Sequence, residues 1–526
     1  MSASVDPATL QLVAAFDPRP VLAEVDRLRD ALTTAGYTVD AVVGLLGPVA
    51  SAALGRAQTT PALLALAGDR SALATLVRLW PLQAEVALAD VAATLPGLVA
   101  PMAAAGIVEV AGTRVRALVD IRPYGDEAHD WWVVCDLLHS LNGRSTPVPA
   151  DHVPGVGGAT TSLAQLTVRR PVGTALDLGT GCGVQAFHLT AQAGRVVATD
   201  VNRRALDMAR LATALNGLAD AVEYREGDFF APVAGQRFDQ VVSNPPFVVS
   251  PATADSAGGG RFAYRDAGFA GDELGELLLS RLPDHLAPGG TGQLLANWEH
   301  RSGVDWRDRV GSWLAPLADA GADVWVLQRE VLDPAAYAET WLRDAAADSR
   351  PDYADRYAAW LRDFADRGVE GIGFGWVSVH AAGHGRRRGT VRIEEHAGPV
   401  AQPLGPAVGA WFDRVAWLAG AGSTDAGLLA ARLAVAPGVD EQRYAEPGAD
   451  DPRAIVLRQH TGLLRSTAVD TAAAGLVGAC DGTLPVGAVV GALAGLLGVD
   501  DAELRAALLP RVRRLVDDGY LEPVGD

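Results

Sequence analysis

The spacing of apolar residues divides the chain into regions with different predicted elements. Over residues 1–120 apolar side chains recur every three to four positions, as in Leu22, Val25, Leu28 and Leu32, which predicts helices. Three further short helices are predicted, over Ala72–Leu79, Leu88–Thr94 and Leu98–Ala105. Two alternating stretches that flank Ala111-Gly112 then predict a β-hairpin.

Residues 171–400 alternate strand-like and helix-like patterns, after a connector over 121–170. Seven strands are predicted, over Thr174–Leu178, Arg195–Thr199, Ala221–Arg225, Phe238–Ser243, Gly292–Asn297, Ala322–Gln328 and Gly375–His380. Two helices, Pro334–Ala347 and Tyr353–Arg367, are predicted before the last strand. This alternation predicts an α/β domain with a doubly wound, Rossmann-like sheet.

Residues 401–526 return to a helical pattern rich in Ala and Leu. Helices are predicted over Ala472–Cys480, Val486–Gly495 and Ala502–Asp518. We therefore expect the core to be flanked by two mainly helical domains, 1–120 and 401–526. Helices followed by a hairpin are typical of a winged helix, and a helical cap with a hairpin is the alternative for residues 1–120.

Composition narrows the classes of function. A chain of 526 residues exceeds one hydrophobic core, so several domains are expected. The net charge of −19 disfavours a protein that coats nucleic acid, because such binding needs phosphate neutralisation, although it does not exclude a local basic site. The sequence contains no lysine, which excludes a lysine nucleophile. Its three cysteines show no C-x-x-C spacing, and we expect no metal site.

The sequence also predicts the compartment. Residues 1–20 contain acidic residues and lack a basic stretch followed by an apolar core, so we expect no secretory signal. The longest apolar run, Leu484–Val499, is interrupted by Pro485 and glycines and is too short for a membrane span. We therefore expect a cytoplasmic protein without a membrane partner.

Candidate chemistry begins at Ala175–Gly183, which reads A-L-D-L-G-T-G-C-G. A predicted strand here runs into glycines, which let the backbone approach a ligand and adopt positive φ. At the carboxyl end of the first strand of a doubly wound sheet, such a loop is typical of a nucleoside-binding site. The residues that we assign to this part of the cofactor site are Asp177, Gly179, Thr180, Gly181 and Gly183.

Polar residues at the ends of the next two predicted strands extend this site. Asp200 lies where a carboxylate binds both ribose hydroxyls, and Asn202 is assigned to the same set. Asp228 follows the third predicted strand, where a carboxylate can contact the adenine edge of a nucleoside, and Phe229 is placed to stack on that adenine. Taken singly, each acid has an alternative as a helix N-cap or a solvated loop carboxylate. A dinucleotide-dependent enzyme would show a similar glycine loop.

The fourth predicted strand ends in Asn244-Pro245-Pro246-Phe247. Methylation of a planar nitrogen is difficult because its lone pair is delocalised. Hydrogen bonds accepted by the Asn244 side chain and the Pro245 carbonyl would hold the NH₂ protons and aim the lone pair at a methyl donor. The two prolines fix the backbone, and Phe247 would stack on the substrate. An N-P turn at the surface is the alternative.

The glycine loop followed by N-P-P-F resembles class I S-adenosylmethionine-dependent methyltransferases of the N-P-P-[YF] branch. That branch includes the HemK-like release-factor glutamine methyltransferases and the small-domain ribosomal RNA methyltransferases. The resemblance implies S-adenosylmethionine as cofactor and Asn244–Phe247 as the catalytic residues, with Asn244 also near the cofactor. It covers residues 150–300 well, and the phenylalanine departs from the tyrosine usual in the glutamine enzymes.

We therefore expect an N-methyltransferase with a macromolecular substrate. The leading hypothesis is an exocyclic amino group of a base in ribosomal RNA. The alternatives are a glutamine amide in a translation factor, a small-molecule nitrogen, and a cofactor-binding regulator. Trp131 and Trp132 either stack on a flipped base or pack the N-terminal region against the core, and Gly258–Arg261 with Tyr264 and Arg265 reads as a lid.

Overall fold

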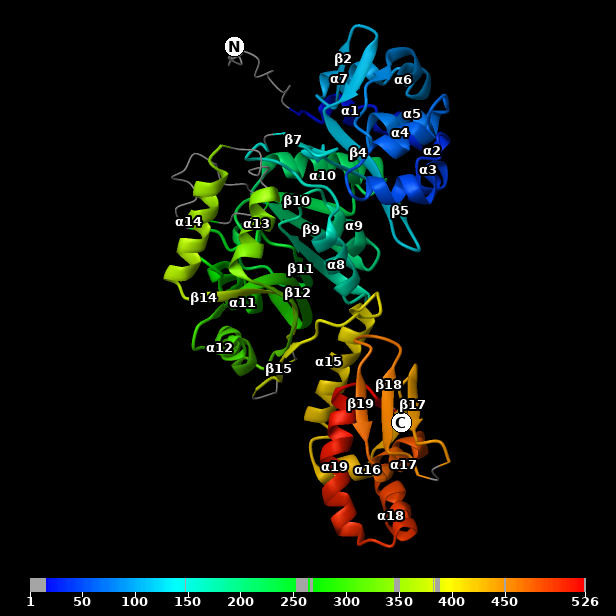
Figure 1. The fold of residues 1–526 in the computed structure, drawn as a ribbon, viewed down its shortest axis with the longest axis vertical. Coiled ribbons are helices and arrows are strands. Elements are labelled where there is room, and N and C mark those ends of the chain that lie inside the picture. Colours follow the sequence, from blue (N-terminus) through cyan, green and yellow to red (C-terminus); the bar gives the residue numbers. More distant parts are fainter. Residues whose placement is uncertain are drawn as a thin grey trace.

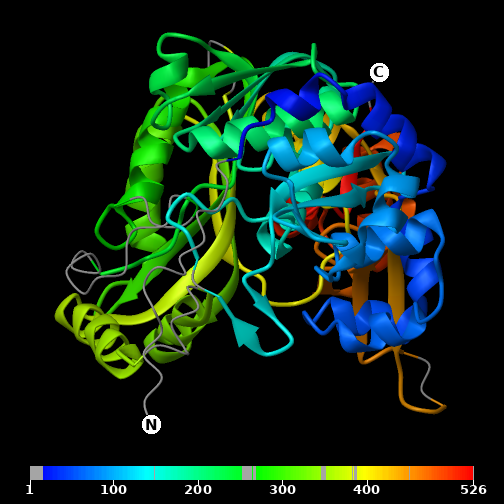
Figure 2. The same ribbon diagram turned by 90° about the horizontal axis from the view of Figure 1, so that it is seen from above.

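The computed structural model describes residues 16–524, except 147, 252–263, 265–267, 345–350, 382, 384–387 and 449–450. Three regions follow one another along the long axis (Figure 1). The N-terminal region lies at one end, the core in the middle and the C-terminal region at the other end. Seen from above, the N-terminal region, blue to cyan, covers one side of the molecule and the green core helices the other (Figure 2).

The N-terminal region consists of helices and one small sheet. The helices are α1 (Arg19–Leu22), α2 (Val25–Thr34), α3 (Val39–Leu54), α4 (Thr60–Ala65), α5 (Ala72–Leu79), α6 (Leu88–Thr94) and α7 (Val99–Ala104). The strands are β1 (Val86–Ala87), β2 (Val108–Ala111) and β3 (Arg114–Ala117), in the antiparallel order β1-β3-β2. The succession α5-β1-α6-α7-β2-β3 is the connectivity of a winged helix.

Residues 119–170 form more structure than a connector would need. Strands β4 (Val119–Gly125) and β5 (Asp130–Asp136) form a hairpin, and β6 (Ser140–Leu141) and β7 (Arg144–Ser145) form a second one. Helix α8 (Gly158–Leu166) then leads into the core. The sequence pattern missed the first hairpin, whose buried residues join one hydrophobic cluster with the N-terminal region and with core helices α9 (Val184–Thr190) and α10 (Arg203–Leu215).

An eight-stranded sheet forms the core. Its strands are β8 (Val172–Leu178), β9 (Ala193–Asp200), β10 (Val222–Glu226), β11 (Phe238–Ser243), β12 (Leu286–Arg301), β13 (Asp323–Leu332), β14 (Val369–His380) and β15 (Val391–Glu395). The order is β10-β9-β8-β11-β12-β14-β13-β15, and β14 runs antiparallel to both of its neighbours. This confirms the predicted α/β fold: the seven predicted strands follow the class I methyltransferase order, and β15 adds an eighth at the edge.

Helices cover both faces of the sheet. One face packs against α11 (Glu273–His285) and α12 (Trp306–Asp319), and the other against α8, α9 and α15 (Gly405–Ala419). A 3₁₀ turn, Ala231–Val233, follows β10. Helices α13 (Pro334–Asp344) and α14 (Tyr353–Asp366) form the predicted insertion before β14 and pack against that strand and against Val248 and Val249.

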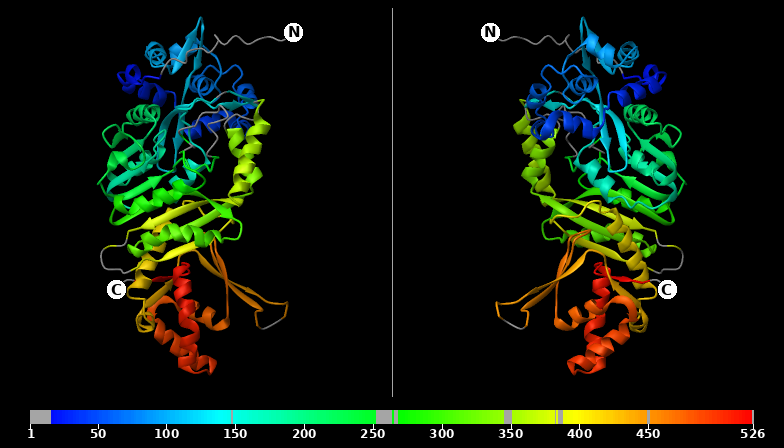
Figure 3. Two further views of the ribbon diagram at one scale, coloured as in Figure 1. Left: turned by 90° about the vertical axis from the view of Figure 1, so that its left-hand side faces the viewer. Right: turned by 90° about the vertical axis from the view of Figure 1, so that its right-hand side faces the viewer.

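The C-terminal region is helical with two small sheets. Besides α15 it contains α16 (Asp425–Ala430), α17 (Thr471–Ala479), α18 (Val486–Leu497) and α19 (Asp501–Asp517). Strands β16 (Arg432–Val435), β20 (Asp481–Pro485) and β21 (Leu521–Pro523) form one sheet, and β17 (Val439–Tyr444), β18 (Ala454–Gln459) and β19 (Ser466–Val469) the other. The second sheet, which the sequence pattern missed, extends sideways in Figure 3.

Among the described residues, no single helix is long and apolar enough to cross a membrane, whereas α2 and α3, bent by 45°, meet the criterion only as a pair.

Candidate functional site

The carboxyl ends of four neighbouring strands meet at one edge of the sheet. Leu178 at the end of β8 pairs with Thr199 of β9 and with Ser243 of β11, and Asp200 pairs with Glu226 of β10. Every residue that we assigned to the site lies in β8 or β9 or in the loops that leave this edge. In doubly wound sheets this is the position where ligands bind.

The glycine loop between β8 and α9 has the backbone that its sequence predicts. Gly179, Gly181 and Gly183 have φ values of 75°, 54° and 88°, a region that side chains with a Cβ rarely adopt. A Cβ at Gly179 would point toward the Asn244 carbonyl oxygen, 4.0 Å away, and one at Gly181 would enter open space. The loop therefore presents bare backbone between β8 and the N-P-P-F segment, as a closely approaching nucleoside requires.

Asp200 joins the second strand to this loop. Its Oδ2 accepts a hydrogen bond from the Gly181 N–H (2.9 Å), and its Oδ1 accepts one from the Asn202 N–H (2.8 Å). Burial raises the pKa of Asp200, while these backbone hydrogen bonds oppose the rise. The carboxylate is thus fixed beside the glycine loop, where it can hold ribose hydroxyls.

Asp177 has a different environment from the other acids. Its side chain is buried, and Oδ2 accepts hydrogen bonds from the Thr180 hydroxyl (2.5 Å) and the Ala186 N–H (3.0 Å). Burial raises its pKa to about 7. Within the described structure, Oδ1 is buried without a hydrogen-bond partner. Asp177 and Thr180 therefore stabilise the conformation of the glycine loop through buried hydrogen bonds.

The Asn202 side chain is engaged in local structure. Its oxygen accepts a hydrogen bond from the Arg204 N–H (3.0 Å) and caps α10, and its nitrogen donates to the Asp151 carbonyl (2.9 Å). In the geometry observed here, Asn202 anchors the segment that leads into α8.

Asp228 and Phe229 follow β10 at the same edge. The Asp228 side chain is exposed, whereas Phe229 is half-buried with a φ of 42°, a strained conformation for an aromatic residue. The Phe229 and Phe269 rings lie with centroids 6.1 Å apart. The turn thus presents a carboxylate beside an aromatic ring, the pair expected at an adenine edge.

The N-P-P-F segment begins where β11 ends. The Ser243 hydroxyl donates to the Leu178 carbonyl (2.8 Å) and ties this segment to the start of the glycine loop. Among the described residues, the Asn244 side-chain amide has no hydrogen-bond partner. The Pro245 carbonyl accepts a hydrogen bond from the Phe247 N–H (2.8 Å), which leaves one of its two lone pairs for a substrate.

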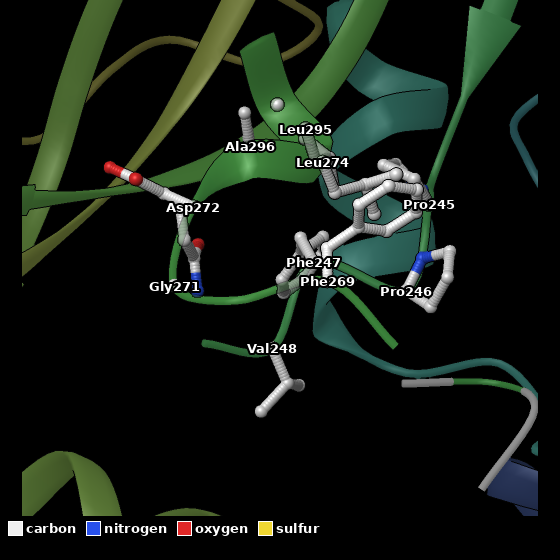
Figure 4. Close-up of a pocket in the computed structure, with 12 residues that line it drawn as sticks. Pro245, Pro246, Phe247, Val248, Phe269, Gly271, Asp272, Leu274, Leu295 and Ala296 are labelled. Atoms are coloured by element: carbon white, nitrogen blue, oxygen red, sulfur yellow. The ribbon is translucent and has the colours of Figure 1, made fainter. Parts of the chain in front are cut away.

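A small pocket adjoins this segment (Figure 4). Pro245, Pro246 and Phe247 form one side, and the Asp272 carboxylate points away from the aromatic rings. The remaining lining residues are Val248, Phe269, Gly271, Leu274, Gly275, Leu295, Ala296 and Asn297. Most of these lining residues are apolar, so the pocket places apolar side chains beside the N-P-P-F segment.

Two residues of this pocket region carried no sequence signal. The buried Tyr337 hydroxyl of α13 accepts hydrogen bonds from the Val249 N–H (2.9 Å) and from the Asn297 side-chain nitrogen (3.1 Å). Trp341, one turn later, meets the Phe247 ring edge-on at 6.4 Å. The α13–α14 insertion therefore holds the segment that follows N-P-P-F. This contact is visible only in the tertiary structure, because Tyr337 and Val249 are far apart in the sequence.

A buried ion network lies behind the pocket. Asp272 pairs with Arg309, and Glu299, which is fully buried, pairs with Arg301 and Arg367. Because these arginines are paired with carboxylates, they are not available to bind phosphate. In the described part of the chain, no group of three or more His, Cys, Asp or Glu side chains could hold a metal ion.

The remaining residues singled out in the sequence either pack inside the protein or lie outside the described residues. Trp131 is buried against Phe187 and His188 of α9, and Trp132 donates its ring N–H to the Tyr37 carbonyl (2.8 Å), so both pack the N-terminal region against the core. Of the predicted lid, only Tyr264 lies within the described residues; its hydroxyl donates to Asp344 (2.7 Å).

Comparison with known proteins supports the resemblance that the two motifs indicated. Residues 156–263 match the family model described as "Methyltransferase small domain". Residues 34–118 and 409–523 match two families that are described as domains of unknown function (DUF7059 and DUF7782). The expected likeness to class I methyltransferases is thereby confirmed for the core.

Curated relatives match part of the chain. A release factor glutamine methyltransferase of Xylella fastidiosa is 36% identical over 24% of this chain and 48% of its own length, and one of Cereibacter sphaeroides is 34% identical over 30% and 66%. A ribosomal RNA small subunit methyltransferase C of Pseudomonas aeruginosa is 33% identical over 30% and 46%. The chain thus spans about half the length of the first of these relatives.

A solved methyltransferase from Pyrococcus furiosus shares 17% identity over 44% of this chain and 87% of its own, with a TM-score of 0.25. A TM-score of this size does not support a fold assignment, which rests instead on the strand order of this chain.

Proposed function

We propose that this protein is an S-adenosylmethionine-dependent N-methyltransferase that acts on a planar nitrogen of a macromolecule. The observation that carries the proposal is the position of Asn244. Its amide lacks a partner among the described residues, while its backbone adjoins the glycine loop at Gly179. A cofactor on that loop and a substrate amide on Asn244 would therefore lie side by side.

The residues present fit the cofactor. The positive-φ glycines leave backbone open to a nucleoside, the Asp200 carboxylate faces the loop, and Asp228 with Phe229 offers an adenine edge and a ring face. When bound, S-adenosylmethionine supplies an electrophilic methyl group. Asp177, Thr180 and Asn202, which the sequence placed in the same set, would act on the cofactor through the loops that they hold.

The N-P-P-F segment would orient the acceptor. The Asn244 side-chain oxygen and the Pro245 carbonyl would each accept one hydrogen bond from the acceptor NH₂ group, which directs the nitrogen lone pair toward the glycine loop. Phe247 and the two prolines would hold the planar group by contact. Asn244 and Pro245 would hold the acceptor nitrogen in this orientation while it gains the methyl group and loses a proton to water. Positioning accounts for most of this catalysis.

A glutamine amide of a protein and an exocyclic amine of an RNA base both satisfy this geometry. The net charge of −19 favours a protein acceptor over RNA, because phosphate binding needs cations. Among the described residues, Arg309 pairs with Asp272, which lines the pocket, and Arg367 pairs with Glu299, which supports the same order. Relatives named for each substrate match part of the chain. We place a protein glutamine first and the RNA base second, with both reactions in the cytoplasm.

The flanking regions are proposed as substrate-docking domains around the catalytic domain 171–400. The winged-helix connectivity of residues 72–117 would suit a DNA-binding regulator, but α7 (V-A-P-M-A-A) carries no basic residue. A regulator would bind S-adenosylmethionine without transferring its methyl group, so a methyl-transfer assay distinguishes a regulator from a methyltransferase.

The test uses radiolabelled S-adenosylmethionine and a lysate from cells that lack this protein. Transfer of label to protease-sensitive material supports the glutamine amide, and transfer to nuclease-sensitive material supports the RNA base. The Asn244→Ala variant, checked for wild-type cofactor affinity, is the matched control. Cofactor binding with no transfer to either pool would overturn the macromolecular N-methyltransferase assignment.

A further inference from the structure

The C-terminal region contains a cavity of about 750 Å³ that lies outside the proposed methyl-transfer site. Its walls are α15, α16 with the start of β16, and the end of β21. The lining combines apolar surface from Trp417, Pro523 and Val524 with the charged side chains of Arg414 and Arg432. This size and this mixture are typical of sites for small molecules.

The Arg414 guanidinium reaches this cavity without a counter-ion. Its Nε is buried and has no hydrogen-bond partner, and the side chain forms no ion pair within the described residues. Burial lowers the pKa of Arg414, because the nearby carboxylates of Glu522 and Asp517 compensate the desolvation only in part. Cations with a buried donor atom are normally paired, so Arg414 favours an anion at this position.

The neighbouring carboxylates are engaged elsewhere. Asp413 accepts two hydrogen bonds from Arg170 (3.1 and 2.6 Å), and Asp517 accepts from Arg392 (3.0 Å) and from the Trp411 ring N–H (3.1 Å). Glu522 lines the cavity but lies beyond ion-pair distance of Arg414. With Asp413 neutralised by Arg170, the two arginines and one glutamate leave the cavity with one net positive charge.

The backbone fixes the position of the guanidinium. Gly519 has a φ of 80°, and a Cβ there would lie 3.0 Å from Nη2 of Arg414. Trp417, three residues after Arg414 on the same face of α15, lines the cavity, and its indole N–H has no acceptor among the described residues. Arg414 and Trp417 therefore bring a cation and an aromatic surface to the same cavity.

We propose that this cavity binds a small molecule that carries an oxyanion, either a carboxylate or a phosphate, beside a planar apolar group. The guanidinium presents donors in a fork that matches two oxygens of such a group, and Trp417 covers the apolar part. Arg432, which is exposed at the start of β16, adds a second cation to the lining. The site is independent of methyl transfer.

The test is calorimetric titration of the full chain with benzoate and with phenyl phosphate, which present the same ring with a carboxylate or a phosphate. Benzylamine, with the opposite charge, is the negative probe. One binding site is expected for at least one of the two anions. The anion that binds more tightly shows whether the natural ligand carries a carboxylate or a phosphate. Absence of binding by both anions would overturn the proposal.

Arg414→Met and Arg458→Gln form a matched pair of variants, since Arg458 is exposed on β18 of the same region. Arg414→Met is expected to weaken anion binding at least about tenfold, as loss of a charged hydrogen-bonded pair does. It should also raise the Tm of the ligand-free protein, because an uncompensated charge is removed. A purely structural Arg414 would instead lower the Tm. Unchanged anion affinity in Arg414→Met, or an equal loss in Arg458→Gln, would refute the site.

Discussion

Replacement of Asp177 by asparagine would test whether the glycine loop is built over a carboxylate that resists ionisation. Asp177 is 1% exposed, and burial raises its pKa to about 7, with a smaller contribution from the charge of Asp200. The hydrogen bonds from Thr180 and Ala186 oppose this rise. Both are accepted by the same oxygen, so an asparagine carbonyl in that place can accept both.

The direction of the effect follows from proton linkage. In the unfolded chain the carboxyl group has its ordinary pKa of 3.8. Between that value and about 7, the unfolded chain loses the proton while the folded protein keeps it, so the free energy of unfolding falls as the pH rises. A rise of about three pK units, at about 1.4 kcal/mol per unit, gives a loss of about 4 kcal/mol that is complete above neutral pH.

Asparagine does not titrate, so Asp177→Asn escapes this loss. Urea unfolding of both proteins from about pH 5 to about pH 8 should show a stability difference that grows in favour of the variant by about 1.4 kcal/mol per pH unit and then levels off near pH 7. A difference that is independent of pH over this range would refute the reasoning.

Glu223→Gln is the matched control for this experiment. Glu223 is exposed on β10, and hydrogen bonds from Arg225 and Arg195 lower its pKa to about 2. Its carboxylate is therefore ionised in both states throughout the measured range. The stability difference between Glu223→Gln and the wild type should stay constant with pH.

Three further outcomes are expected. Asn244→Ala should abolish methyl transfer and keep S-adenosylmethionine affinity near that of the wild type in calorimetry; loss of both together would contradict the role given to Asn244. Asp200→Ala should weaken cofactor binding by roughly 1–3 kcal/mol, and an unchanged Kd would remove Asp200 from the ribose. Tyr337→Phe should lower kcat and leave the cofactor Kd unchanged, because its hydroxyl holds Val249 and Asn297 rather than the glycine loop; a wild-type kcat would contradict this positioning role.

The periodic parts of the fold could be predicted from the sequence. Helices α5 and α6 and strand β11 have the predicted bounds, and the seven predicted core strands are all present. The pattern missed the β4–β5 hairpin and the β17–β18–β19 sheet. Strands β17 and β19 contain no fully buried residue, so neither shows the alternation of a buried face.

The site was predictable where chemistry depends on local sequence. The glycines must reach positive φ, and the ends of parallel strands must meet at one edge, so the loop, Asp200, Asp228 and Asn244 were placed together from their order alone. The roles of two residues could be assigned only from the tertiary structure. Asp177 is a buried support of the loop, and Asn202 caps α10 and holds Asp151. A strand-end residue looks the same in sequence whether its side chain faces a ligand or the interior.

The sequence by itself determined the α/β core, the glycine loop and the N-P-P-F segment, because period, turn residues and strand order are local properties. Only the tertiary structure decided which residues outside these motifs meet the site. Tyr337 lies 88 residues from Val249 in the chain, yet its hydroxyl accepts the Val249 N–H. Arg414 likewise belongs to a helix with an ordinary apolar pattern, and only packing left its Nε buried without a partner in the described structure. Contacts of this kind depend on how distant elements pack, which no local pattern records.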